Sequence, residues 1–246
     1  MSGPAPLVSV VIPCYNATLF IPDALDSLRA QTFRDFEIIL VNDGCPDTEN
    51  LERALEPYRD EIRYLKSGEW ASISGSRNTG ILASSARYIS LLDADDVWEP
   101  DYLAVMTGIL ERDASLDLVY PNARFFGEGP WIGGTHMEKF PASGDVTLEK
   151  LISREICVFI SVTARRESLL RAGLFDPQIR GGEDWDLWMR VIRTGGKIAY
   201  DRRVLAGYRH RVGSMSADKL DLLRNGLAVC QKYLKFPDLT PGEREL

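Results

Sequence analysis

Three carboxylates occur within four residues at Asp93-Ala94-Asp95-Asp96, directly after the apolar run Ile89–Leu92. Carboxylates this close repel one another unless a cation is shared between them. Their hard oxygens are the ligands that Mg²⁺ and Mn²⁺ prefer, and such ions bridge to substrate phosphates. A structural role is the alternative, because aspartates are favoured where a helix begins, and a helix is expected near Pro100. Both roles are compatible, with Asp96 at the helix start and Asp95 on a metal ion.

A second candidate site is Gly181-Gly182-Glu183-Asp184-Trp185. Its two glycines allow close approach of another part of the backbone. Asp184 begins an amphipathic helix expected over residues 184–193, and a desolvated carboxylate there can act as a general base. Helix capping is the plain alternative. Trp185 and Trp188 share one helix face, where core packing is expected for one of them and sugar stacking is the alternative.

Further polar residues follow other short apolar runs. Asp43, in Asn42-Asp43-Gly44, can accept hydrogen bonds from a base imide or ribose hydroxyls, or it can simply form a turn. Arg77, Arg209 and Arg211 could each neutralise a diphosphate. His210 is one of only two histidines, and a lone histidine is more often structural than a ligand.

The elements expected around these residues form a repeated βα pattern. Repeated βα units predict an α/β fold with a mostly parallel, doubly wound sheet and helices on both faces. Ligands bind beyond the carboxyl ends of the strands in such sheets, so the chemistry is expected just after Ile12, Val41 and Leu92. The expected strands are 8–12, 37–41, 62–65, 88–92 and 116–120, and the expected helices are 21–31, 48–55, 76–84 and 100–112.

The second half has a mixed pattern. Residues 126–142 are rich in glycine and proline and carry Trp131, so we expect a long loop that acts as a lid or binding loop. Strands at 159–164, 198–200 and 204–208 and helices at 166–172 and 184–193 follow. A final amphipathic helix is expected over 217–236. We therefore expect one domain over 1–216, followed by a C-terminal helix and tail over 217–246.

Composition excludes several classes of protein. The chain has 246 residues, 29 Lys+Arg against 36 Asp+Glu and a net charge of −7, which argues against a nucleic-acid binder. The N-terminus lacks the features of a signal peptide, and no apolar run is long enough to cross a bilayer. Cys14, Cys45, Cys157 and Cys230 are widely spaced, as expected for free thiols in a reducing compartment. We therefore expect a cytoplasmic protein.

Several common enzyme motifs are absent from the sequence. There is no Gly-x-Gly-x-x-Gly after a strong strand, no Gly-Lys-Ser/Thr of a P-loop and no Gly-x-Ser-x-Gly elbow. A dinucleotide dehydrogenase, a P-loop nucleotide hydrolase and an α/β-hydrolase are therefore disfavoured.

In their order and spacing, the motifs resemble those of the family 2 inverting glycosyltransferases, which have the GT-A fold. No single motif decides the match, but together they cover most of the chain, from residue 7 to about 216. The matching motifs are Val10-Val11-Ile12-Pro13-Cys14-Tyr15-Asn16, Val41-Asn42-Asp43-Gly44, Arg77-Asn78-x-Gly80, Leu92-Asp93-Ala94-Asp95-Asp96, Glu183-Asp184-Trp185-Asp186-Leu187-Trp188 and Tyr208-Arg209-x-x-x-Gly213-Ser214.

The resemblance implies a nucleoside-diphosphate sugar as donor, with a UDP-sugar favoured, and a divalent metal, Mn²⁺ or Mg²⁺, as cofactor. It implies that Asp43 contacts the base, that Asp93 faces the ribose or donor sugar, and that Asp95 is the metal ligand, with His210 as a further metal or diphosphate contact. The family's usual Asp-Asp-Gly is Asn42-Asp43-Gly44 here, which keeps the second carboxylate. The implied donor-binding residues are Pro13, Tyr15, Asn16, Asp43, Arg77 and Asp93.

The resemblance also implies a reaction. Asp184 would be the catalytic base that deprotonates an acceptor hydroxyl, and a single displacement would invert the anomeric carbon. Glu183, Trp185 and Trp131 are the candidates for contact with the acceptor or the sugar. A nucleotidyltransferase and a non-catalytic nucleotide-sugar binding module are the alternatives, although the first normally has a Gly-rich, basic loop after its first strand.

The expected acceptor is a glycan or lipid-linked glycan in polysaccharide or glycoconjugate assembly. The 126–142 loop and residues 178–180 are expected to select it. For the helix at 217–236 three roles stay open: packing on the domain, pairing in a homodimer, or peripheral contact with an anionic membrane at its inner face.

Overall fold

A computed structural model describes residues 5–67, 72–129, 131–211, 219–236, 239–240 and 242. In the last helix, the side chains of residues 219, 221 and 222 are not described. Gly213 and Ser214, the end of the last motif above, lie outside the described residues.

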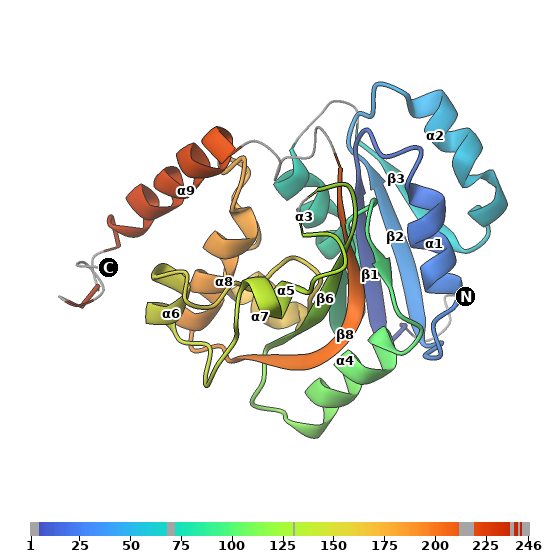
Figure 1. The fold of residues 1–246 in the computed structure, drawn as a ribbon. Helices are drawn as coiled ribbons and strands as arrows, with labels where there is room; N and C mark the ends of the chain where they lie inside the picture. The colour runs from blue at the N-terminus through green and yellow to red at the C-terminus, as the bar shows by residue number, and fades with distance from the viewer. Residues whose placement is uncertain are drawn as a thin grey trace.

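A single mixed sheet forms the centre of the molecule (Figure 1). Its first half is parallel, because β1 pairs with both β2 and β4, and β2 pairs with β3, in the same direction. The β-branched runs predicted from the sequence form these strands, and β1 is buried along its whole length. The strands of this half are β1 (Val8–Cys14), β2 (Phe36–Asn42), β3 (Ile62–Lys66) and β4 (Tyr88–Leu91).

The second half of the sheet is mixed. Short β7 (Thr163–Arg165) pairs antiparallel with both β4 and β6 (Leu118–Gly127). Two reversals restore the direction, so β6 runs the same way as β4, and β8 (Ile198–His210) is parallel to β6. Edge strand β5 (Val97–Trp98) pairs antiparallel with β8. The end of β8 therefore reaches the same sheet edge as the ends of β1, β2 and β4.

Helices cover both faces, as the sequence predicted. Figure 1 shows α1 and α2 on one side of β1 and β2 and α3 on the other. The side chain of Gln31, after α1, binds backbone atoms of Glu99 and Leu103, which puts α4 on the side of α1. The main helices are α1 (Ile21–Arg29), α2 (Thr48–Leu55), α3 (Ile73–Ala83), α4 (Tyr102–Arg112), α7 (Arg166–Arg171) and α8 (Glu183–Arg193), with the short turn η1 (Glu56–Tyr58).

Several predicted elements need correction. Residues 126–142 are not one loop, because Phe126 and Gly127 extend β6 and a short helix α5 (His136–Lys139) follows. Thr135 begins α5 with a capping box in which its side chain and that of Glu138 bind each other's backbone N–H. The strands predicted at 198–200 and 204–208 are one continuous strand, β8. The strand predicted at 159–164 is shorter and begins later, as β7 over Thr163–Arg165. No pattern in the sequence predicts β5 or the short α6 (Leu148–Ile152).

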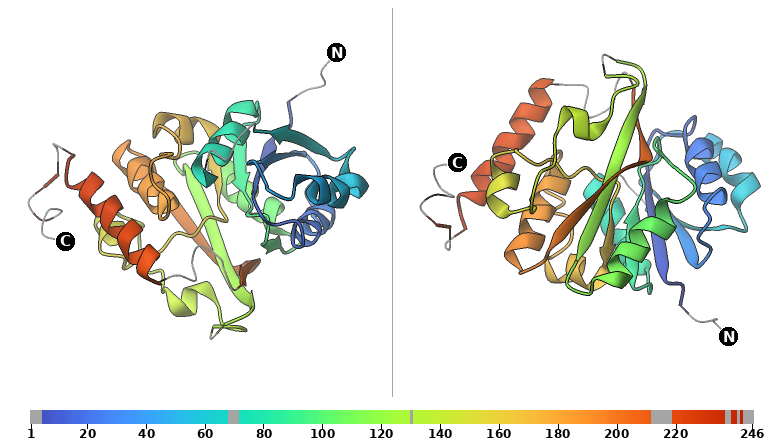
Figure 2. Two further views of the ribbon diagram at one scale, coloured as in Figure 1. Left: turned by 90° about the horizontal axis from the view of Figure 1, so that it is seen from above. Right: turned by 60° about the horizontal axis from the view of Figure 1, so that its bottom comes forward.

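The last helix, α9 (Lys219–Tyr233), lies at the end of the molecule farthest from α2 (Figure 2). Its buried contacts include Val229 and Tyr233, and Lys232 bridges Asp176 at 2.7 Å and Asp186 at 2.9 Å. It therefore packs on the domain, the first of the three roles considered. The stripe of leucines at 220, 223, 227 and 234 faces solvent. Within the described residues, no helix has the length and apolar character needed to span a bilayer.

Candidate active site

The first predicted site residues, Pro13, Tyr15 and Asn16, lie at or just after the end of β1, at the sheet edge that is at the top of Figure 1. Pro13 is buried inside β1 opposite Val41, and the exposed Tyr15 follows the last residue of the strand, Cys14. Asn16 has a positive φ of 50°, a left-handed conformation that asparagine tolerates better than most residues. The chain therefore turns sharply away from the sheet and leaves Tyr15 and Asn16 at its rim.

The second strand brings Asn42 and Asp43 beside this turn. The backbone N–H of Asp43 donates to the Cys14 carbonyl at 3.1 Å, and its buried side chain accepts a hydrogen bond from Ser67. Asn42 accepts from the Cys45 N–H at 2.8 Å and donates to Tyr64 Oη at 2.7 Å. Asn42 thus shapes the loop, while Asp43 lies deep in the predicted nucleotide region.

The acidic run after β4 divides into different environments. Asp96 is buried and accepts a hydrogen bond from the Arg209 N–H at 2.7 Å. Burial raises its pKa well above the usual range, and the neighbouring Asp95 and Asp93 raise it further. The expectation that Asp96 begins the next helix is wrong, because β5 comes between them and Asp101 precedes α4. Asp96 instead connects this loop to β8 through the hydrogen bond that it accepts from Arg209.

Two arginines from β8 and its end meet the acidic run. Arg211 Nε donates to Asp95 Oδ2 at 2.7 Å. Arg209 donates to the Asp95 carbonyl at 2.7 Å and to Asp23 at 2.6 Å. The sequence suggested that these arginines bind a diphosphate but not that they contact Asp95. These contacts depend on the pairing of β5 with β8, which brings the end of β8 beside the acidic run.

The donor set at Asp93 and Asp95 fits a divalent cation. Burial raises the pKa of Asp95, and the charge of Asp93 raises it further, a repulsion that a shared cation would offset. Across the described residues, no group of three or more His, Cys, Asp and Glu side chains forms a complete metal site. A cation here would take its other ligands from water and phosphate oxygens, as Mg²⁺ usually does.

His210 lies in an aromatic cluster. Its ring centroid is 5.0 Å from that of Phe125 and 5.4 Å from that of Tyr208. Neighbouring residues of a strand point to opposite faces, so His210 lies on the face of β8 opposite Arg209 and Arg211. Burial lowers its pKa. The structure therefore does not bring His210 to Asp95 through these contacts, and its role at a metal stays a prediction.

Arg77 on α3 joins two carboxylates. Its guanidinium donates to Asp93 Oδ1 at 2.7 Å and to Glu183 Oε1 at 2.6 Å. The side chain is almost fully buried, and the guanidinium carbon lies 5.3 Å from the centre of the Phe175 ring. Arg77 was expected to hold the nucleotide, whereas these contacts make it a bridge between the acidic run and the start of α8.

Asp184 follows Glu183 in the first turn of α8. The pKa of Asp184 is raised to about 7, because burial and the adjacent Glu183 charge outweigh the opposing effects of Arg77 and the Trp185 N–H. The Gly182 before the helix has a φ of 74°, which glycine adopts without strain. A carboxylate with a pKa near 7 can take up a proton at neutral pH, which is what a general base requires.

The tryptophans of α8 have different roles. Trp188 is fully buried in the core. Trp185 is nearly buried and donates its indole N–H to the Leu151 carbonyl at 2.7 Å, which ties α6 to α8. Trp131 is 43% exposed. Trp131 is thus the better placed of the two candidates to meet a ligand from solvent.

Comparison with known proteins agrees with this arrangement. The family model described as "Glycosyl transferase family 2" matches residues 9–171. The chain is 25% identical over 232 residues to the UDP-Glc:alpha-D-GlcNAc-diphosphoundecaprenol beta-1,3-glucosyltransferase WfgD of Escherichia coli, with 94% of this chain and 88% of WfgD covered. The chain spans about a third of the length of the first curated relatives it matches.

Two solved structures have the same fold. TarS 1–349 of S. aureus in complex with UDP-GlcNAc aligns with a TM-score of 0.76 at 19% identity, covering 97% of this chain and 69% of TarS. The mannosyltransferase PcManGT of Pyrobaculum calidifontis, in complex with GDP-Man and Mn²⁺, aligns with a TM-score of 0.74 at 18% identity, covering 98% and 68%. By sequence and by fold, the chain belongs to glycosyl transferase family 2 and has the GT-A fold of glycosyltransferases.

Proposed function

We propose that this chain transfers a monosaccharide from a nucleoside-diphosphate sugar to an acceptor hydroxyl, with inversion at the anomeric carbon and Asp184 as the base. The observation that carries the proposal is the position of Asp184. Its carboxylate has a pKa raised to about 7 and lies in the first turn of α8, linked through Glu183 and Arg77 to the acidic run.

The reaction is a single displacement. Asp184 removes the proton of the acceptor hydroxyl, and the oxygen attacks the anomeric carbon from the face opposite the leaving group. The new carbon–oxygen bond forms as the bond to the diphosphate oxygen breaks, so the nucleoside diphosphate departs with the electron pair. Arg77 holds Glu183 beside Asp184 and thereby keeps the start of α8 facing the donor side.

Negative charge grows on the diphosphate as it leaves. Asp95, with Asp93 beside it, would hold a divalent metal, Mn²⁺ or Mg²⁺, which when bound supplies a Lewis acid for the diphosphate oxygens. Arg211, hydrogen bonded to Asp95, and Arg209 add positive charge at the same place. His210 is proposed only as a secondary contact.

For the donor we favour a UDP-sugar. The nucleoside would lie against the ends of β1 and β2, where Asp43 accepts from the base and Pro13, Tyr15 and Asn16 line the pocket, with Asp93 at the ribose or sugar. Support comes from the fold shared with TarS, whose structure is a UDP-GlcNAc complex, and from the printed name of WfgD as a UDP-Glc enzyme. PcManGT binds GDP-Man, so a GDP-sugar is the competing donor.

For the acceptor we propose a glycan or lipid-linked glycan in polysaccharide or glycoconjugate assembly, supported by the diphosphoundecaprenol acceptor in the name of WfgD. We also propose that residues 1–216 form the catalytic domain and that 217–246 are an appended helix and tail. The packing of Asn225 and Val229 of α9 against Gly181 and Gly182 supports a role in holding the start of α8, which carries Asp184.

A donor screen tests the proposal. UDP- and GDP-sugars are each incubated with the protein, with Mn²⁺ and with chelator, and release of nucleoside diphosphate is measured. We expect metal-dependent release from one donor, stimulated by an acceptor, and NMR of the product should show an inverted anomeric configuration. Retained configuration would contradict the single displacement, and binding of every donor without any turnover would favour a non-catalytic module.

A further inference from the structure

Two cations, Lys139 and Arg154, have no carboxylate partner within the described part of the chain. Lys139 Nζ lies 5.2 Å from the ring centres of Trp131 and Phe140 and 5.4 Å from that of Phe125. The guanidinium carbon of Arg154 lies 4.7 Å from the centre of the Trp185 ring. Each cation is therefore held by aromatic faces and keeps its N–H donors available.

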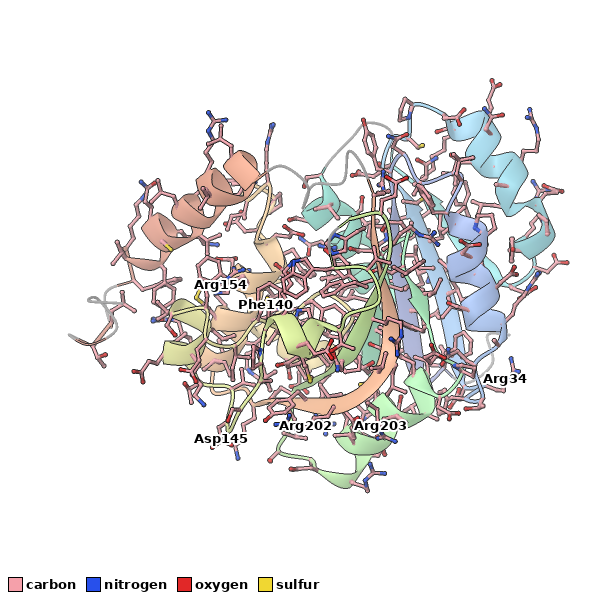
Figure 3. All side chains as sticks on the ribbon, viewed as in Figure 1. Arg34, Phe140, Asp145, Arg154, Arg202 and Arg203 are labelled. Atoms are coloured by element: carbon pink, nitrogen blue, oxygen red, sulfur yellow. The ribbon has the colours of Figure 1, made fainter. Side chains whose placement is uncertain are left out.

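Both cations lie around one point, the Cys157 thiol. Burial raises the pKa of this thiol to about 11, and Arg154, Asp184 and Lys139 all act on it through their charges. The charge of Arg154 also acts on Asp184. Arg154 is thus within electrostatic range of the proposed base, Lys139 and Arg154 both act on the Cys157 thiol, and Figure 3 shows Arg154 and Phe140, the neighbour of Lys139, in the same part of the molecule.

The acidic residues next to these cations in the sequence are engaged elsewhere. Glu138 accepts a hydrogen bond from the Thr135 N–H at 2.7 Å, in the capping box of α5. Glu155 lies 3.7 Å from Lys150. Neither carboxylate neutralises Lys139 or Arg154, so positive charge accumulates around the Cys157 thiol, which is itself within electrostatic range of Asp184, in a chain whose net charge is −7.

The two cations are separate from those assigned to the leaving diphosphate. Arg209 and Arg211 contact Asp95 from the end of β8, on the donor side of the site. Lys139 and Arg154 instead come from α5 and the turn after α6, and α6 is tied to α8 through Trp185. Because Asp184 must lie between donor and acceptor, this second pair belongs with the acceptor.

We propose that Lys139 and Arg154 form an anion subsite that binds a phosphate group of the acceptor, so that the acceptor is a sugar linked to a phosphate or diphosphate. The planar fork of arginine and the compact charge of lysine both suit phosphate oxygens. Exposed Trp131 offers a face on which the acceptor sugar can stack. This inference rests on the proposed function, because it assigns the acceptor of the same site.

Three synthetic acceptors with the same sugar, N-acetylglucosamine, test the subsite. They are an octyl glycoside, an octyl diphosphate glycoside and an octyl glycoside with a carboxylate at the chain end. We expect the wild-type protein to have the lowest KM for the diphosphate, and K139Q/R154Q to raise that KM by at least about tenfold. The KM for donor and for the neutral glycoside should stay unchanged.

Two controls separate charge from structure. K139R/R154K keeps both charges and should retain most of the preference for diphosphate. Arg34→Gln removes a cation that Figure 3 shows far from Arg154, and it should leave all three KM values unchanged. Equal KM values for the neutral and diphosphate acceptors in wild-type protein, or an equal loss on both in K139Q/R154Q, would overturn the subsite. A lowest KM for the carboxylate acceptor would reject the phosphate assignment.

A binding measurement covers the case in which no acceptor is used. With UDP saturating the donor side, titration calorimetry measures the affinity for methyl diphosphate in wild-type protein and in K139Q/R154Q. A loss of at least about tenfold supports the subsite even without turnover, and equal affinity overturns it. Absence of donor turnover with every acceptor counts against the proposed function alone, so the two failures are distinguishable.

Discussion

The Arg77 guanidinium and the Glu183 carboxylate, 106 positions apart in the chain, form a buried ion pair with a 2.6 Å hydrogen bond. The same guanidinium binds Asp93 at 2.7 Å, so one side chain on α3 fixes the acidic run after β4 relative to the start of α8. Any donor held at Asp93 and Asp95 is thereby placed relative to Asp184. The ion pair is the mechanical link between the donor-binding half of the site and the base.

Removal of this arginine should destabilise the fold. Arg77→Ala leaves Glu183 buried with an uncompensated charge, and breaking a buried pair in this way costs about 3–5 kcal/mol. Urea unfolding of the variant and the wild-type protein measures the loss. Arg63→Ala, which removes an exposed arginine that donates to the Ala83 carbonyl, is the matched control and should cost under about 1 kcal/mol. Similar losses in both variants would show that Arg77 is not the link.

The pH dependence of turnover should report Asp184. Burial raises its pKa to about 7, and a general base acts only when deprotonated, so kcat/KM should rise with pH about tenfold per unit below 7 and level off above it. Initial rates from pH 5 to pH 9 at saturating metal measure the profile. A rate independent of pH across this range would contradict the assignment.

Ionisation of Asp184, which should raise turnover, should lower the stability of the folded protein. The pKa of Asp184 is higher in the folded protein than the value of about 3.9 in the unfolded chain, so the folded state holds a proton that the unfolded state has lost. This contribution is present at low pH and is lost as pH rises through 7. Because Asp184 is only partly buried, we expect Asp184→Asn to gain about 1 kcal/mol at pH 8 relative to pH 5.

Thermal or urea unfolding of both proteins at the two pH values measures this difference. Wild-type and variant should respond alike below about pH 4 and diverge between about pH 4 and pH 7, where the unfolded chain has lost the Asp184 proton and the folded protein still holds it. Asp113→Asn is the control: the pKa of Asp113 is lowered by its hydrogen bonds with Ser115, so its carboxylate is ionised in the folded and unfolded states at both pH values, and the variant should show no such gain. A larger stability loss in Asp184→Asn at pH 8 than at pH 5 would contradict the raised pKa.

Metal-dependent donor binding should depend on Asp95. Asp95→Asn removes a charged oxygen ligand, so Mn²⁺ should no longer strengthen binding of UDP or GDP, whereas the wild-type protein should gain at least about tenfold. Calorimetric titration with and without Mn²⁺ measures the gain. An Mn²⁺ effect of the same size in wild-type and variant would exclude Asp95 as the ligand.

Much of the fold could be predicted from the sequence because most of its strands and helices are indicated by local residue patterns. The buried strands are short β-branched runs, and the amphipathic spacing of α1 and α8 identifies them as helices. Strand β5 has two residues and α6 has five, too few to display a period. The sequence predicts two strands in place of β8 because the polar Asp201-Arg202-Arg203 interrupts its apolar pattern.

The site residues could be named, but their partners could not. Asp43, Asp95 and Asp184 stand out by type and position, since each follows a strand or begins a helix. The partners of Arg77 and Arg211 depend on which distant elements meet, and no local pattern carries that information. The roles proposed for Lys139 and Arg154 escape the sequence for the same reason, because only the packing of α5 on β6 and of α6 on α8 brings both cations to the Cys157 thiol.

The turnover of Asp184→Asn tests the central claim most directly. The amide keeps the shape of the side chain but cannot take the acceptor proton, so kcat should fall by about 10²–10⁴-fold while the Kd for the donor nucleotide stays within about twofold. Both quantities are measured on the same preparation, by nucleoside-diphosphate release and by calorimetry. A kcat equal to that of the wild-type protein, with donor binding intact, would contradict the assignment of Asp184 as the base.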